Sequence, residues 1–437
     1  MSELRERARS FLHRHGMEPD DFDLERGLVE YMAEMRRGLA GQASTLEMIP
    51  TYIELGQRVP TGEPVIAVDA GGTNLRIALV HFDESLKPVI QNFRKYIMPG
   101  VEREVSREEF FRTFAAHLEE FLPASSRIGF CFSFSMEQLP SKDGRVNSLG
   151  KEVKAPQVLG ELVGESLAVT LRARGHRQPL RIVIVNDTVT AMLAGMAGSA
   201  GRGYGGYLGF ILGTGTNTCY LEKNSNITKT PGLDPAGTQV INMESGNYGL
   251  IPQGTMDREY NAGTQFPDQH LLEKMVSGAY LGAVALLTLR RAAAEGLFGG
   301  QAAAALDRLT GLSPEAIHEY LSYSASTNHP LGAVIQAGSD EDRITAFHLL
   351  DRLIERAAKL AALSLTGAVL QSGAGTSPCA PVCIVVEGSV YWGLRGMRRK
   401  VECYLKSFLE ERHGRYYDII PVENASLVGA AIAGLTN

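Results

Sequence analysis

The chain has 437 residues, with 44% hydrophobic and 21% charged side chains, a composition typical of a soluble globular protein with room for about two domains. Its formal net charge of −6 argues against non-specific binding to nucleic acid or to an anionic membrane, so we expect neither partner. Five irregularly spaced cysteines complete no zinc-binding pattern, and the mixed-charge N-terminus carries no secretory or transit signal. We therefore expect a cytoplasmic protein with reduced thiols.

The first elements along the chain are helices, predicted by apolar spacing over residues 2–40, followed by a connector rich in proline and glycine. A β-hairpin is predicted over residues 65–80, where two apolar runs flank the sequence Gly-Gly-Thr-Asn at 71–74. The glycines let backbone N–H groups approach a ligand, the Thr and Asn add donors, and Asp69 ends the first run. These features suit a Mg²⁺-bound polyphosphate, although a tight turn with a turn-type aspartate fits them equally well.

Helices and strands then alternate, which predicts an α/β architecture. Helices are expected over residues 108–122 and 158–174, and strands over residues 128–134 and 182–185. The glycine-rich stretch at 195–206 has little apolar content, so we expect it to be a hinge or a surface connector.

The hairpin pattern then occurs a second time, at residues 207–221, where an apolar run, a Gly-Thr-Gly turn and Thr216-Asn217 precede another apolar run. Because Thr73-Asn74 occupies the same place in the first hairpin, we interpret the pair as an internal duplication of an α/β domain. The remainder is predicted to be mostly helical, with a strand at 382–386 and a small-residue helix at 425–435.

Three carboxylates stand where substrate chemistry is expected. Asp187 follows an apolar strand and starts a helix, where a carboxylate can take a proton from an attacking hydroxyl, or can simply cap the helix. Glu244 lies between a strand and a glycine-rich turn, and Glu273 lies at the start of a helix. They could bind the hydroxyls of a polyol, or they could be a loop carboxylate and an ordinary acid in a first helical turn.

Seven short motifs occur in this order: Asp-Ala-Gly-Gly-Thr-Asn-Leu-Arg at 69–76, Phe-Ser-Phe at 132–134, Val-Asn-Asp-Thr at 185–188, Gly-Thr-Gly-Thr-Asn at 213–217, Asn-Met-Glu-Ser-Gly at 242–246, Glu-Lys-Met at 273–275 and Glu-Gly-Ser-Val-Tyr at 387–391. Together they resemble the hexokinases of eukaryotic type. The resemblance implies a two-lobed actin-like ATPase (ribonuclease H-like) fold, with duplicated α/β domains around a cleft. The small lobe would hold residues 63–189 and 423–437, and the large lobe residues 1–62 and 190–422.

The resemblance also implies a role for each matching position. Asp187 would be the general base on the sugar 6-hydroxyl, with Lys151 as a second catalytic residue. The residues that would contact the hexose are Ser133, Lys151, Asn186, Asp187, Asn217, Glu244 and Glu273. Those that would hold ATP are Asp69, Gly71, Gly72, Thr73, Asn74, Arg76, Gly213, Thr214, Gly215, Gly388 and Ser389, with Asp69 also holding Mg²⁺ through water.

The implied function is that of an ATP-dependent hexokinase or glucokinase of glycolysis, acting on the 6-hydroxyl of glucose as a monomer or homodimer. The chain departs from the family pattern at Gly150, where Thr is usual, and at Ser245, where many relatives have Trp. Ser135 and Glu387 are further departures. Another sugar substrate (mannose, fructose or N-acetylglucosamine), another phosphate donor such as pyrophosphate or ADP, and a catalytically silent sugar-binding regulator stay open as alternatives.

Overall fold

The computed structural model describes residues 2–55, 58–150, 153–199 and 202–437. Lys151, which was expected to contact the sugar and to take part in catalysis, lies outside the described residues. The lobe boundaries given above stay a prediction.

The first half of the chain forms a five-stranded sheet. Its strand order is β4-β3-β2-β5-β8, with bounds Pro88–Ile97, Asn74–Phe82, Val65–Gly71, Arg127–Phe132 and Arg181–Val185. β2, β3 and β4 form an antiparallel meander, and β5 and β8 continue the sheet in parallel on the other side of β2. One face is covered by helices α3 (Arg107–Leu118) and α4 (Val163–Ala173), and a separate hairpin pairs β6 (Ser135–Gln138) with β7 (Gly144–Ser148).

The second half forms a six-stranded sheet that repeats this topology. Its order is β1-β11-β10-β9-β12-β13, with bounds Ile49–Pro50, Thr238–Asn242, Thr216–Lys223, Gly206–Leu212, Val382–Glu387 and Tyr417–Ile420. Again three antiparallel strands, β9, β10 and β11, are followed by two parallel ones beside the first, β12 and β13. The internal duplication expected from the two hairpins is therefore confirmed, whereas β13 was not foreseen.

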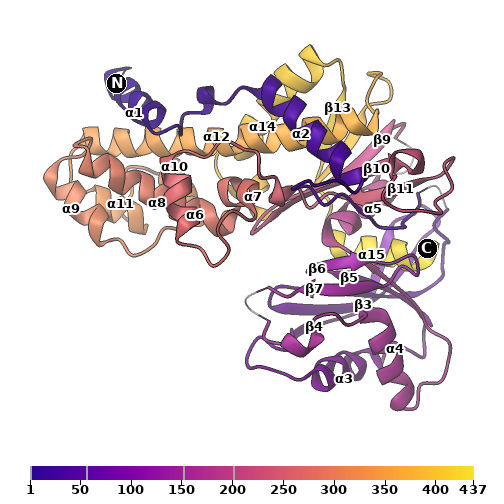
Figure 1. The fold of residues 1–437 in the computed structure, drawn as a ribbon. Helices are drawn as coiled ribbons and strands as arrows, with labels where there is room; N and C mark the ends of the chain where they lie inside the picture. The colour runs from indigo at the N-terminus through magenta and orange to yellow at the C-terminus, as the bar shows by residue number, and fades with distance from the viewer. Residues whose placement is uncertain (1, 56–57, 151–152, 200–201) are drawn as a thin grey trace.

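Two helices, α5 (Asp187–Gly198) and α15 (Ala425–Thr436), lie between the two sheets (Figure 1). Their backbones come so close to their neighbours that only glycine fits. A Cβ on Gly129 of β5 would lie 1.7 Å from the Ala430 carbonyl oxygen, and one on Gly429 would lie 2.0 Å from that of Thr190. The segment expected as a connector from residue 195 is thus helical as far as Gly198, because Gly195 packs against Val385 of β12.

The remaining helices surround the long helix α12 (Asp340–Ser372) and share one apolar core with the second sheet (Figure 1). They are α1 (Ser2–Arg14), α2 (Leu24–Leu39), α6 (Thr255–Ala262), α7 (Leu271–Val276), α8 (Gly278–Ala294), α9 (Gly300–Arg308), α10 (Pro314–Ser322), α11 (Pro330–Ile335), α13 (Ser389–Gly393) and α14 (Met397–Tyr404). Within the described part of the chain, none of the helices, α12 included, is long and apolar enough to cross a bilayer.

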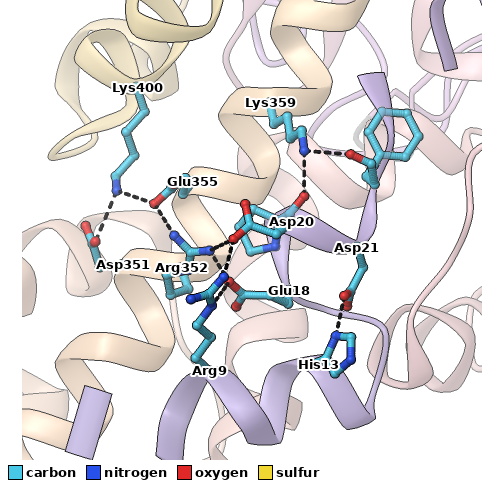
Figure 2. Close-up of polar contacts among 12 residues, drawn as sticks. Arg9, His13, Glu18, Asp20, Asp21, Asp351, Arg352, Glu355, Lys359 and Lys400 are labelled. Atoms are coloured by element: carbon cyan, nitrogen blue, oxygen red, sulfur yellow. Dashed lines mark hydrogen bonds and ion pairs between the residues drawn. The ribbon is translucent and has the colours of Figure 1, made fainter. Parts of the chain in front are cut away.

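The N-terminal segment is fastened to α12 by buried charges (Figure 2). Lys359 Nζ donates to the carbonyl oxygens of Pro19 and Phe22, at 2.8 and 2.6 Å. Glu18, which is 3% exposed, pairs with Arg9 and with Arg352 of α12. Because a buried charge without a partner is costly, these contacts fix the path of the chain between α1 and α2.

Candidate active site

The predicted catalytic and metal-side residues lie at the carboxyl ends of neighbouring parallel strands. Asp69 is near the end of β2, Ser133 follows β5, and Asn186 and Asp187 follow β8. Since β2, β5 and β8 are adjacent and parallel, these side chains share one edge of the sheet, which is where open α/β sheets bind ligands.

Asp187 starts helix α5, but the side chain that caps this helix is Asn186. Asn186 Oδ1 accepts from the Thr188 N–H at 2.9 Å. Asp187 Oδ1 accepts from the same N–H at 2.8 Å and from Thr188 Oγ1 at 3.3 Å, which fixes the carboxylate in place. Burial raises the pKa of Asp187, and the hydrogen bonds from Thr188 partly oppose this shift. The arrangement leaves Asp187 Oδ2 as the oxygen that Thr188 does not engage.

The first hairpin presents an exposed turn beside an ion pair between a buried carboxylate and a partly exposed arginine. Gly72 has a φ of +55° and Thr73 is exposed, so the backbone of the turn is open to a ligand. Arg76 stands opposite Asp69 in the β2–β3 ladder, with 3.4 Å between Arg76 Nη1 and Asp69 Oδ2. Burial raises the pKa of Asp69 to about 6, and the charge of Arg76 opposes this shift. The turn and the carboxylate therefore present donors and a negative charge side by side.

The second loop, Gly213-Thr214-Gly215, is tied to the start of helix α8. The N–H groups of Gly278 and Ala279 donate to the carbonyl oxygens of Gly213 and Thr214, at 2.8 and 3.1 Å. Gly388, after β12, packs against the same loop with a φ of +119°, and a Cβ there would lie 2.3 Å from the Leu212 carbonyl oxygen. Only glycine fits at this position, so the loop and the end of β12 meet backbone to backbone.

A cavity of about 440 Å³ opens beside this second loop. Its lining includes Thr214 and Ser389, both predicted to bind ATP. It also includes residues that the sequence did not single out: Gly278, Ala279, Pro314, Glu315, His318, Glu319, Val390, Gly393 and Leu394. The helix that carries Pro314–His318 was predicted, but nothing in its local pattern indicates which loop it faces.

Glu244 lies in a strained loop that is held by a ring of amide hydrogen bonds. Its backbone is left-handed, with φ 53° and ψ 49°, which is costly for a residue with a Cβ. Asn217 Nδ2 donates to Asn242 Oδ1 at 2.7 Å, and Asn242 Nδ2 donates to Glu244 Oε1 at 2.8 Å. The ring closes where the Ser245 N–H donates to Asn217 Oδ1 at 3.2 Å. Asn242, which no prediction assigned to the site, therefore orients the Glu244 carboxylate.

Glu273 joins this loop to the second hairpin. Its Oε2 accepts from the Thr216 N–H at 3.0 Å. Gly215 and Gly246 flank the side chain so closely that a Cβ would lie 2.7 Å from Glu273 Oε2 and 3.1 Å from Glu273 Cβ, respectively. Burial raises the pKa of Glu273, against the hydrogen bonds that it accepts. The start of α7 is thus packed between the two loops that were predicted to bind sugar and phosphate.

The carboxylates of the site act on one another. Burial raises the pKa of Glu244 to about 7, with the charge of Glu47 as a second cause, and burial raises that of Glu387 to about 7 as well. The charge of Asp187 is a further cause of the raised pKa of Glu244, Glu387, Glu273 and Asp69. Asp187 therefore lies within electrostatic reach of both the predicted sugar side and the predicted phosphate side.

The donor set around Asp69 suits a magnesium ion that arrives with phosphate. No group of three or more metal-ligating side chains occurs among the residues that the structure describes. Mg²⁺ often needs only one or two protein carboxylates, because it keeps several waters and takes the rest of its ligands from substrate phosphates. Asp69 is 8% exposed and lies near Glu387 and Asp187, so a cation would relieve the mutual repulsion there.

Comparisons with known proteins agree with this geometry. A family model described as hexokinase matches residues 207–436, and a second with the same description matches residues 13–197. Hexokinase-5 of Oryza sativa subsp. japonica is 28% identical over 386 residues, which cover 81% of this chain and 74% of that protein. Hexokinase-3 of Mus musculus is 28% identical over 409 residues, which cover 88% of this chain but only 43% of that protein.

A solved structure shows the same fold. The hexokinase of Schistosoma mansoni, complexed with glucose, matches with a TM-score of 0.77 and 23% identity, and the match covers 99% of each chain. The predicted fold class, an α/β two-lobed actin-like fold with duplicated domains, is therefore confirmed. The roles of the individual site residues stay predictions.

Proposed function

The chain belongs to the hexokinase family, and we therefore propose that it is an ATP-dependent hexose kinase that phosphorylates the 6-hydroxyl of glucose and of related hexoses. The observation that carries the proposal is the placement of Asp187. It is a fixed carboxylate with a raised pKa at the end of a parallel strand, within electrostatic reach of carboxylates on both sides of the site.

Asp187 takes the proton from the attacking hydroxyl in this proposal. A raised pKa brings the carboxylate closer to neutral pH, where a general base works best. Thr188 holds Oδ1, so the sugar hydroxyl donates to Oδ2, and the proton moves there as the sugar oxygen attacks the γ-phosphorus of ATP. The bond from the γ-phosphorus to the bridging oxygen breaks, and ADP leaves with that oxygen. Ser133, Asn186, Asn217, Glu244 and Glu273 hold the other hydroxyls and fix the orientation of the hexose.

ATP binds between the two hairpin turns. The open backbone around Gly72 and the N–H groups of Thr214 and Gly215 supply amide donors for the phosphates, while the Gly213 N–H closes the second loop on the Gly215 carbonyl oxygen. The side chains of Thr73, Asn74, Arg76 and Thr214 add further donors. The cavity beside Thr214 and Ser389 is large enough for a nucleoside, which supports ATP over pyrophosphate as the donor. Asp69 would hold Mg²⁺ through water, and the bound ion would neutralise charge on the phosphates.

The setting of the reaction belongs to the same proposal. All five cysteines are free, and Cys379 and Cys403 are exposed, which supports a reducing compartment such as the cytoplasm. There the enzyme would feed hexose 6-phosphate into carbohydrate metabolism.

A panel of hexoses crossed with phosphate donors tests the proposal. The purified chain is mixed with glucose, mannose, fructose or N-acetylglucosamine, and with ATP, ADP or pyrophosphate, and product is followed as hexose 6-phosphate. We expect turnover with glucose and ATP that depends on Mg²⁺. Glucose binding by calorimetry without turnover under any pairing would instead identify a sugar-binding regulator.

A further inference from the structure

A continuous line of buried hydroxyls leads from helix α2 to the loop that carries Glu244. Ser245 Oγ lies 3.1 Å from Thr218 Oγ1, and Thr218 Oγ1 lies 3.0 Å from Ser364 Oγ of α12. Ser364 Oγ in turn lies 2.8 Å from the Tyr31 hydroxyl of α2. None of the four residues is more than 2% exposed. Four separate segments of the chain therefore meet through hydroxyl groups inside an otherwise apolar core.

Thr218 is the central member of this line. Its hydroxyl has one proton, so it can donate to only one of its two hydroxyl partners and accepts from the other. If this hydroxyl is removed, Ser245 and Ser364 each lose a partner at a depth where water does not replace it.

The loop beside this line needs to be held. Glu244 has left-handed backbone angles that its own side chain disfavours, and such a conformation persists only where the surroundings fix it. Ser245, the next residue, is fixed through its N–H by Asn217 and through its side chain by Thr218. Thr218 therefore holds the side chain of Ser245, whereas Asn217 holds its backbone.

We propose that Thr218 is a positioning residue for sugar recognition: through Ser245 it keeps Glu244 in the conformation that presents its carboxylate to the hexose. This inference rests on the proposed function, because it takes Glu244 as a sugar contact. The side chain of Ser245 is short enough to place its hydroxyl within hydrogen-bond distance of Thr218.

The test compares three variants, each assayed for the glucose Kd by calorimetry and for KM and kcat. Thr218→Val removes the hydroxyl and keeps the shape of the side chain. Because the Ser245 side chain then loses the buried hydrogen bond that holds it, we expect the glucose Kd and KM to rise about threefold to tenfold. The value of kcat should stay within about twofold of that of the unmodified chain. Thr218→Ser keeps the hydroxyl and should bind glucose like the unmodified chain. Thr366→Val is the matched control. Thr366, on α12, is fully buried like Thr218, but its hydroxyl has no hydrogen-bond partner among the described residues.

Three results would overturn the inference: an unchanged glucose Kd in Thr218→Val, an equal loss in Thr366→Val, or a loss in Thr218→Ser as large as in Thr218→Val. The melting temperature of each variant separates a general loss of folding from a specific loss of affinity. If the unmodified chain phosphorylates no hexose, the proposed function fails. If it does and Thr218→Val behaves normally, only the positioning role fails.

Discussion

The two hairpins of the duplicated fold have the same topology but use their Thr-Asn pairs differently. In the first, Thr73 is exposed and Asn74 is half-buried, so both are available to a ligand at the turn. In the second, Thr216 and Asn217 are buried: the Thr216 N–H donates to Glu273, and Asn217 holds the Glu244 loop. The duplicated motif is thus an exposed turn in one half, and in the other half its residues hold neighbouring segments in place.

The halves also differ in charge. At the position that matches Asp69 relative to the Thr-Asn pair, the second hairpin has Leu212. The second loop has no such carboxylate, but its backbone is held rigidly, because it is hydrogen-bonded to the start of α8 and packed against Gly388. In the proposed mechanism, the first half supplies the carboxylate on the metal side, Asp69, and the second half supplies a rigid backbone loop for the phosphates. Asp187, the proposed general base, lies between the two halves.

The largest expected effect is at Asp187, where both halves converge. Asp187→Asn keeps the size of the side chain and removes its basicity, so kcat should fall about 10²–10⁴-fold, the usual contribution of a general base. Glucose affinity by calorimetry should change much less. Near-normal turnover in a folded Asp187→Asn protein would remove Asp187 from the mechanism.

The next effect tests the difference in charge between the hairpins. Asp69→Asn should lower kcat/KM for Mg·ATP by about 10–10³-fold and raise the Mg²⁺ concentration needed for half-maximal rate, because the metal loses its protein carboxylate. The control is Glu84→Gln, an equal change of charge at an exposed residue of the same sheet region. Equal Mg²⁺ dependence in the two variants would place the metal elsewhere.

Alanine substitutions compare the rigidity of the two loops. Gly388→Ala meets the Leu212 carbonyl oxygen in addition to its unfavourable φ, so it should cost about 2–3 kcal/mol of unfolding free energy and weaken ATP binding. Gly72→Ala has an unfavourable φ but open space around it, so about 1 kcal/mol is expected. Urea denaturation of both variants measures the difference, and a Gly72→Ala cost as large as that of Gly388→Ala would contradict it.

The smallest effect concerns pH. Burial raises the pKa of Glu244 and of Glu387 from 4.5 to about 7, so between these values the folded chain holds protons that the unfolded chain has released. Each of these two carboxylates should therefore lower the stability of the ligand-free protein by about 1–2 kcal/mol as pH rises from about 5.5 to 7.5. Glu244→Gln should flatten part of this slope in urea titrations, whereas Glu84→Gln should retain it. A slope of opposite sign would mean that these carboxylates are charged and stabilised in the folded state.

The sequence predicted those helices, strands and turns that depend on the residues within the segment itself. Both hairpins, the strand before Asp187 and the small-residue helix at the C-terminal end were readable from apolar runs and turn residues. The packing of α5 could not be predicted in this way. Its glycines are typical of a connector, and the sequence does not show that Gly195 packs against Val385, which is far away in the sequence.

The same limit applies to the site. Asp187 and Asp69 were singled out by their places at strand ends, but the contacts of Asn242 and Thr218 depend on Asn217 and Ser364, which lie 25 and 146 residues away in the sequence. The cavity lined by His318 arises where four segments of the chain meet, and the residue spacing within any one of them does not predict that contact.

Helix α12 has a consequence for how the protein opens. Every residue from 356 to 369 is buried, including Arg356 and Lys359, so no side of this stretch faces solvent. Its amide hydrogens should exchange with deuterium only when the whole surrounding core unfolds, while the exposed turn at Gly72 exchanges through local opening. The exposed turn of the first hairpin can thus fluctuate on a short timescale, while helix α12 should be among the slowest-exchanging parts of the chain.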